Sequence, residues 1–263
     1  MNTIEFFGLP ASGKSTIVEK LVKFFKRKKK TSNYRNLTIN ELRKQKKISL
    51  FEYFFWIYME SKREKKLNVN SKLLKKSFLS QLKERLTFFF PKRKILLKKI
   101  DELFLEYKSQ HLNYIYNFNK ILEKYNKNGE FKYTLDWIKF EIIGYELSKK
   151  NPDIILINSE GFYQRSLSFL IRVNISEEDL ENYIKSCPEI SKLNILINKD
   201  LKRNTIQNIL KSKNQNFKFD RNFIKKYFFI LRNLKKKMNS NIYIFSLNEI
   251  DKTYENIKKK FNA

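Results

Sequence analysis

The sequence predicts an α/β fold in which a parallel sheet is covered by helices on both faces. Residues 3–7 form an apolar run of strand length, which leads through a glycine-containing loop into a helix-periodic segment at 16–25. Later apolar runs at 154–158, 193–198 and 241–247 lack polar alternation, as strands do when helices cover both of their faces. With helices between these strands, the chain is expected to form a three-layer parallel sheet.

The loop after the first strand carries the most informative motif. Residues 8–15 read Gly-Leu-Pro-Ala-Ser-Gly-Lys-Ser, a full match to G-x-x-x-x-G-K-[ST]. Gly8 and Gly13 allow backbone N–H groups to turn around phosphate oxygens. Lys14 adds charge at the β- and γ-phosphates, and the Ser15 hydroxyl is placed to ligate Mg²⁺. A chance match is the alternative, but the strand and the helix on either side of the loop favour a phosphate site.

The motif therefore predicts a nucleotide-binding site with Ser15 as its metal ligand. The residues expected to contact the nucleotide are Gly8, Leu9, Pro10, Ala11, Ser12, Gly13, Lys14, Ser15 and Thr16.

The segment between the first helix and residue 154 predicts one weak strand at 35–39 and then helices. About one hundred residues with almost no glycine or proline are too many for an ordinary crossover connection. We therefore expect a single domain spanning 1–263 with a helical insertion at about 48–150. The candidate helices of this insertion cover 49–65, 71–89, 93–125 and 134–149.

A second cluster of polar residues follows the strand at 154–158, where residues 159–165 read Ser-Glu-Gly-Phe-Tyr-Gln-Arg. Glu160 is expected to act as a general base toward a substrate hydroxyl or as an outer-sphere partner of Mg²⁺. Gly161 would let the chain turn close to the site, and Arg165 would hold a phosphate or an acidic substrate group. The alternative is that Glu160 only caps the following helix, because helix N-termini attract carboxylates.

Composition excludes several classes of site. The single cysteine and single histidine rule out an internal disulfide and argue against a zinc site built by this chain. No apolar stretch approaches the length of a membrane-spanning helix, and no segment resembles a signal peptide. We therefore expect a cytoplasmic protein with no membrane partner.

The formal net charge of +29 is the composition's most unusual feature. Clustered Lys and Arg residues bind nucleic-acid backbones, but abundant Lys, Asn, Ile and Phe with scarce Gly and Ala also follow from AT-rich coding DNA. Nucleic acid is therefore a partner that the sequence allows but does not favour. A basic segment containing Arg203, Lys211, Lys213 and Arg221 would close over the nucleotide or form an ordinary solvated helix.

Taken together, these motifs resemble the nucleotide and nucleoside kinase branch of P-loop proteins, which includes the thymidylate and adenylate kinases. The resemblance covers the first 25 residues and residues 151–215, and it rests on the loop at 8–15, the segment at 159–165 and a later strand followed by a basic helix. The chain is most similar to bacterial kinase-like ATP-binding proteins that carry Asp-Glu-Gly at the second motif. Glu160 and Gly161 match that motif, and Pro188 matches a proline before the fourth strand.

The resemblance implies a P-loop kinase fold with a five-stranded sheet of order 2-3-1-4-5 and a large inserted helical lobe. It also implies ATP with Mg²⁺ as cofactors and phosphoryl transfer to a small-molecule acceptor, with Lys14, Glu160 and Arg165 as catalytic residues. The sequence departs from the family at Ser159, where an acidic residue is usual, and in a lid with lysines in place of arginines.

Two other functions stay open. One is a non-catalytic or regulatory nucleotide-binding protein whose basic surface engages nucleic acid or protein. The other is a substrate-phosphorylating toxin or resistance enzyme, which would share the same site.

Overall fold

The computed structural model describes residues 2–9, 14–25, 30–57, 90–126, 134–158, 161–189, 192–196, 221–238, 242–245, 252 and 254–255. The predicted helix at 71–89 and the basic segment around 203–213 lie outside these residues, as do loop positions 10–13 and Glu160.

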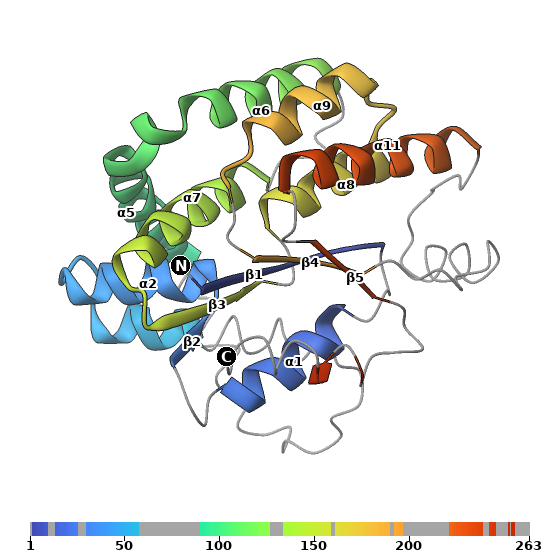
Figure 1. Ribbon diagram of the computed structural model, residues 1–263. Helices are drawn as coiled ribbons and strands as arrows, with labels where there is room; N and C mark the ends of the chain where they lie inside the picture. The colour runs from blue at the N-terminus through green and yellow to red at the C-terminus, as the bar shows by residue number, and fades with distance from the viewer. Residues whose placement is uncertain are drawn as a thin grey trace, which may run out of the picture.

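A parallel sheet lies at the centre of the molecule (Figure 1). Its strands are β1 (Asn2–Phe7), β2 (Lys30–Ser32), β3 (Ile154–Asn158), β4 (Lys192–Leu196) and β5 (Ile242–Phe245). The strand order is β2-β3-β1-β4-β5, and every neighbouring pair is parallel. Side-chain burial is described for β1 and β3 and for part of β2, whereas β4 and β5 are described through their backbone pairing.

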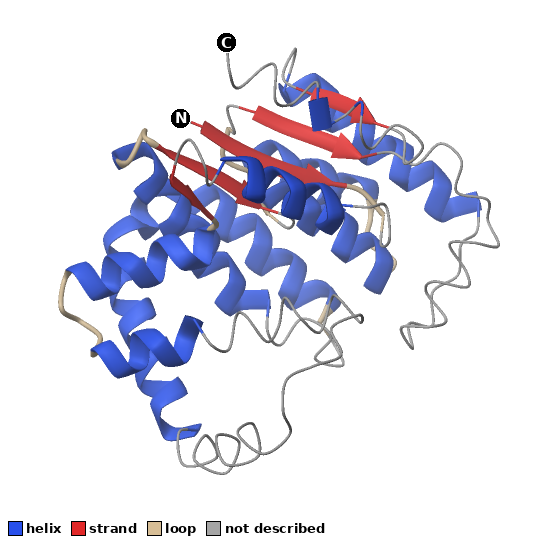
Figure 2. Ribbon diagram, turned by 90° about the horizontal axis from the view of Figure 1, so that it is seen from below, coloured by secondary structure: helices blue, strands red, loops and turns tan. Residues whose placement is uncertain are grey.

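The two faces of the sheet are covered very unequally. Helix α1 (Lys14–Phe25) lies on one face, and the other described long helices lie on the opposite face (Figures 1 and 2). Successive side chains of a strand point to opposite faces. Accordingly Ile4 and Phe6 pack with α1, whereas Phe7 packs into the larger helical layer. Glu5 shares the face of Phe7, so the alternation places a carboxyl group inside the larger core.

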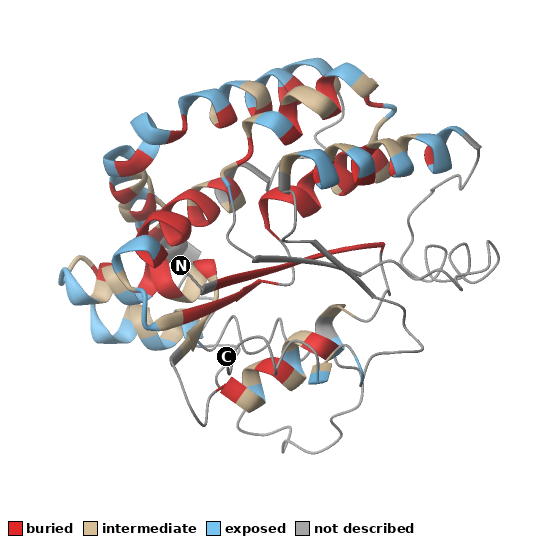
Figure 3. Ribbon diagram, in the orientation of Figure 1, coloured by how far each residue is buried: buried red, intermediate tan, exposed pale blue. Residues whose placement is uncertain are grey.

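The larger layer is built from seven helices among the described residues. They are α2 (Tyr34–Lys44), α5 (Phe90–Lys108), α6 (Leu112–Tyr125), α7 (Thr134–Lys150), α8 (Phe162–Arg172), α9 (Glu177–Ser186) and α11 (Arg221–Met238). A further helical segment covers 50–57. Buried residues run through the whole layer in a continuous hydrophobic cluster that also includes Leu156 of β3 (Figure 3).

The predicted fold class was wrong in its balance of helix and sheet. Helices make up most of the described chain, and the strands are only three to six residues long. Helices α5, α6 and α7 share one hydrophobic core with α2, α8, α9 and α11, so they form part of the layer that covers the sheet. These three helices join the layer because their apolar faces must be buried against neighbouring elements.

The predicted second strand was also wrong, because residues 35–39 lie in α2. Asn33 caps this helix, since its side-chain oxygen accepts a hydrogen bond from Asn36 N–H at 2.8 Å. The cap satisfies a free N–H at the helix start and thereby favours helix over strand. Strand β2 lies immediately before the cap, at Lys30–Ser32.

The long helix expected at 93–125 is two helices separated by a turn of 3₁₀ helix at Ser109–His111. At this turn His111 is buried and its Nε2 lies 2.8 Å from Glu146 Oε1 of α7. Burial lowers the pKa of His111 despite the opposing effect of Glu146. The break lets the chain bend and pack α6 against α9. None of the described helices is long and apolar enough to cross a membrane.

Candidate functional site

The loop at 8–15 joins β1 to α1, as its motif predicts. Gly8 and Leu9 are buried, and α1 begins at Lys14. The Lys14 ammonium group points back across the loop, where Nζ donates to Gly8 O at 2.5 Å and to Leu9 O at 2.9 Å. Thr16 is exposed on the first turn of α1. The charge of Lys14 therefore lies beside the backbone of Gly8 and Leu9, where the motif predicts that phosphate binds.

The side chain of Gln164 on α8 also contacts Gly8. Its Oε1 accepts from Gly8 N–H at 3.0 Å, and its Nε2 donates to Gly8 O at 3.2 Å. Gln164 belongs to the second motif at 159–165 and lies in the first turn of α8. The two motifs, more than 150 residues apart in the chain, therefore contact each other through this side chain.

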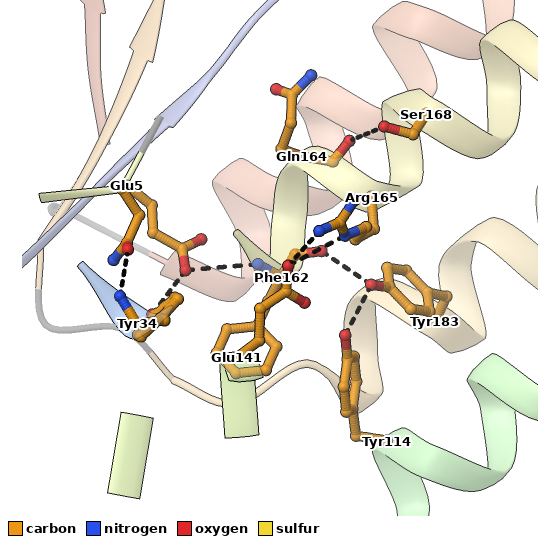
Figure 4. Close-up of polar contacts among 10 residues, drawn as sticks. Glu5, Tyr34, Tyr114, Glu141, Phe162, Gln164, Arg165, Ser168 and Tyr183 are labelled. Atoms are coloured by element: carbon orange, nitrogen blue, oxygen red, sulfur yellow. Dashed lines mark hydrogen bonds and ion pairs between the residues drawn. The ribbon is translucent and has the colours of Figure 1, made fainter. Parts of the chain in front are cut away.

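Both backbone polar atoms of Phe162, the first residue of α8, form hydrogen bonds with other elements. Phe162 N–H donates to Glu5 Oε1 at 3.4 Å, and Phe162 O accepts from Tyr183 Oη at 2.9 Å (Figure 4). Tyr114 Oη in turn lies 3.1 Å from Tyr183 Oη. These bonds fix the position at which the chain leaves the second motif. Glu160 itself lies outside the described residues, so its predicted role as a base stays a prediction.

Glu5 is a buried carboxyl group on the central strand. Its Oε1 accepts from Tyr34 Oη at 2.7 Å, and Asn158, the neighbour of Glu5 on β3, accepts from Tyr34 N–H at 3.0 Å. Burial away from water raises the pKa of Glu5 to about 8, outweighing the hydrogen bond from Tyr34 that favours the charged form. Burial also raises the pKa of Tyr34 well above its usual value. At neutral pH both groups are therefore protonated.

Gly161 lies directly against the Glu5 carboxyl group. A Cβ added to it would lie 2.1 Å from Glu5 Oε1, so the carboxyl group would have to shift to accept a larger residue. The backbone at Gly161 is extended, with φ −158° and ψ −161°, so the close approach and not the backbone conformation favours glycine here. The sequence predicted that Gly161 lets the chain turn close to the site, and in the structure Gly161 approaches the Glu5 carboxyl group.

We expect Gly161→Ala to lower the free energy of unfolding by about 1–3 kcal/mol, the usual cost of overpacking. Urea denaturation of the single variants Gly161→Ala and Glu5→Ala and of the double variant measures the effect. Because Glu5→Ala removes the atoms that clash, the double variant should cost less than the sum of the two single variants. Strict additivity would show that the two residues do not interact.

Arg165, expected to hold phosphate or substrate, is buried and ion-paired. Its Nη2 and Nε lie 2.6 Å and 3.0 Å from Glu141 Oε1 of α7, and both residues are less than one-tenth exposed. The guanidinium also lies 5.0 Å from the ring centre of Trp137, over which Arg35 stacks at 3.3 Å. In this arrangement Arg165 ties α8 to α7. Its predicted contact with phosphate or substrate stays a prediction.

Several of these residues were not expected from the sequence. Glu5 lies within the apolar run at 3–7, and a glutamate in the middle of a buried strand is itself a signal. Gln164 lies within the motif at 159–165, which predicts no role for it. Tyr34 and Glu141 carried no local signal, because their partners are brought to them only by the fold. No group of three or more metal-ligating His, Cys, Asp or Glu side chains occurs within the described part of the chain.

Comparisons with known proteins add no family assignment. No family model matches the chain, and neither a curated protein nor a solved structure shows a significant match to it.

Proposed function

We propose that the chain is an ATP-dependent phosphotransferase that transfers the γ-phosphoryl group of Mg-ATP to a small-molecule acceptor. The observation that carries the proposal is the placement of Lys14 over the peptide groups of Gly8 and Leu9, at the junction of a buried strand and a helix N-terminus. A helix N-terminus and a lysine that converge on one loop make an anion site, and the loop sequence matches the nucleotide-binding motif.

The loop residues and Glu160 have separate tasks in this proposal. The backbone of residues 8–15 would bind the β-phosphate, and Lys14 would leave the two carbonyl groups to bind the γ-phosphate. The Ser15 hydroxyl would hold Mg²⁺, whose charge offsets that of the phosphates. An acceptor hydroxyl oxygen would attack the γ-phosphorus as the bond to the β–γ bridging oxygen breaks. Glu160 would take the hydroxyl proton, and ADP would leave.

Substituting the two proposed catalytic residues separates binding from transfer. Lys14→Ala should abolish transfer and weaken Mg-ATP binding, because the charge at the γ-phosphate is lost. Glu160→Gln should abolish transfer but leave Mg-ATP binding close to wild type. Both are measured as ATP consumption with nucleosides, nucleotides, sugars and sugar phosphates offered as acceptors, and as nucleotide affinity by titration calorimetry.

The control is Glu178→Gln, which makes the same chemical change on an exposed residue of α9 and should have no effect on either measurement. Turnover like that of wild type in Glu160→Gln would remove the acceptor-activating role. Binding of Mg-ATP without turnover on any acceptor would favour the non-catalytic nucleotide-binding protein instead.

A further inference from the structure

Gln164 binds both backbone polar atoms of Gly8, the first residue of the phosphate-binding loop. Its carboxamide accepts from Gly8 N–H at 3.0 Å and donates to Gly8 O at 3.2 Å, and the side chain is buried. From these bonds we infer that Gln164 is a positioning residue, which keeps the backbone of Gly8 oriented for phosphate and links the loop to the first turns of α8. The inference rests on the proposed function and deepens it.

The two hydrogen bonds to Gly8 need a side chain that carries both an acceptor and a donor, as glutamine does. A carboxamide offers one acceptor oxygen and a donor NH₂ group on the same planar unit, so it can satisfy both polar atoms of Gly8. A buried N–H or C=O without a partner costs free energy comparable to a lost hydrogen bond. A methionine at this position would fill similar space but leave both contacts unmade.

Gly8 O accepts hydrogen bonds from both Gln164 and Lys14, and this is why the Gln164 contact matters for nucleotide binding. Lys14 Nζ also donates to this oxygen, at 2.5 Å. In the proposed function Lys14 must leave Gly8 O in order to bind a phosphate. Gln164 Nε2 would still donate to Gly8 O, so this carbonyl would keep a hydrogen bond and the loop backbone would keep its orientation.

The position of Gln164 in the chain links this contact to the second motif. It lies three residues after Gly161, and the first turn of α8 is held by Glu5 and Tyr183 through the Phe162 peptide. Gln164 therefore links Gly8, the first residue of the phosphate-binding loop, to the first turns of α8, the helix that follows Gly161 in the chain.

One amide reports the contact directly. Phe7-Gly8 is the only Phe-Gly pair in the chain, so labelling phenylalanine with ¹³C at the carbonyl and glycine with ¹⁵N gives a single correlated NMR signal, that of Gly8. In Gln164→Met the hydrogen exchange of this amide should be at least about tenfold faster than in wild type. The Gly144 amide inside α7 should keep its wild-type rate, which would exclude general unfolding as the cause.

Nucleotide affinity is the second readout. Titration calorimetry should show Mg-ATP binding at least about tenfold weaker in Gln164→Met than in wild type, the effect of losing roughly one buried hydrogen bond. Ser168→Ala is the matched control on the same helix, because Ser168 Oγ contacts only the backbone oxygen of Gln164 among the bonds drawn (Figure 4). It should leave both the Gly8 amide and the nucleotide affinity unchanged.

Gln164→Glu provides a test that does not depend on how Gln164→Met folds. Its carboxylate accepts from Gly8 N–H but cannot donate to Gly8 O, whereas its protonated form does both. Mg-ATP affinity relative to wild type should therefore be weakened at pH 8 and should recover as the pH is lowered. Absence of this recovery would show that the hydrogen bond to Gly8 O does not contribute to nucleotide binding.

The outcomes separate the inference from the proposed function. If wild type binds Mg-ATP and the Gln164 variants bind it equally well with an unchanged Gly8 amide, the positioning role is overturned and the proposed function stands. If wild type does not bind Mg-ATP, the proposed function is overturned, and the role of Gln164 in nucleotide binding is overturned with it.

Discussion

Replacing Arg165 with methionine is expected to lower the free energy of unfolding by about 3–5 kcal/mol. The change removes the cation that offsets the burial of Glu141, whose Oε1 lies 2.6 Å from Arg165 Nη2. Both side chains are less than one-tenth exposed, so water cannot take over the role of the lost partner. Urea denaturation of the two proteins at neutral pH measures the difference.

Two control variants make this prediction specific. The double variant Arg165→Met with Glu141→Leu should recover most of the lost stability, because replacing both members of a buried pair with apolar residues is often neutral. Lys23→Met breaks the exposed pair with Glu19 on α1 and should cost less than about 1 kcal/mol. A cost as small as that in Arg165→Met itself would show that the buried pair does not hold α8 to α7.

Replacing Glu5 with glutamine is expected to flatten the dependence of stability on pH. The pKa of Glu5 is raised from 4.5 to about 8 in the folded protein, because the buried carboxyl resists ionisation. Between these values the folded state binds one more proton at this group than the unfolded state does. Stability therefore falls as the pH rises from about 4.5 to about 8, with a slope of up to about 1.4 kcal/mol per pH unit from this group.

Glutamine keeps the neutral shape of the protonated acid and removes the titration. Glu5→Gln should therefore match wild type near pH 4.5 and become progressively more stable than wild type as the pH rises to 8. Tyr34 stays protonated throughout, because burial raises the pKa of its hydroxyl, so it can still donate to residue 5. The measurement is the free energy of unfolding of both proteins in urea at intervals from pH 4.5 to 9. Parallel profiles would show that Glu5 is ionised at neutral pH in the folded protein.

The parts of the structure that could be predicted are those encoded over short stretches of chain. The junction of β1, the loop and α1 follows from a motif in which glycine spacing, lysine and helix period all lie within 25 residues. The second strand was misplaced because the apolar content of 35–39 suits a strand as well as a helix. The deciding group was Asn33, just outside the run, whose side chain caps α2.

The polar network beneath the site could not be predicted, because its partners are far apart in the chain. Glu5 and Tyr34 are 29 positions apart, and Gln164 and Gly8 are 156 apart. Neither separation follows a helix or strand period, so no local pattern indicates the contact. The break at Ser109–His111 was missed for a similar reason, since it depends on Glu146 of another helix.

Titration calorimetry of the wild-type chain with Mg-ATP shows whether the loop at 8–15 binds a nucleoside triphosphate. Wild type should bind one Mg-ATP per chain, and Lys14→Ala should bind it at least about tenfold more weakly, because a charge-assisted contact to phosphate is lost. No binding to wild type, or equal affinities for the two proteins, would contradict the claim.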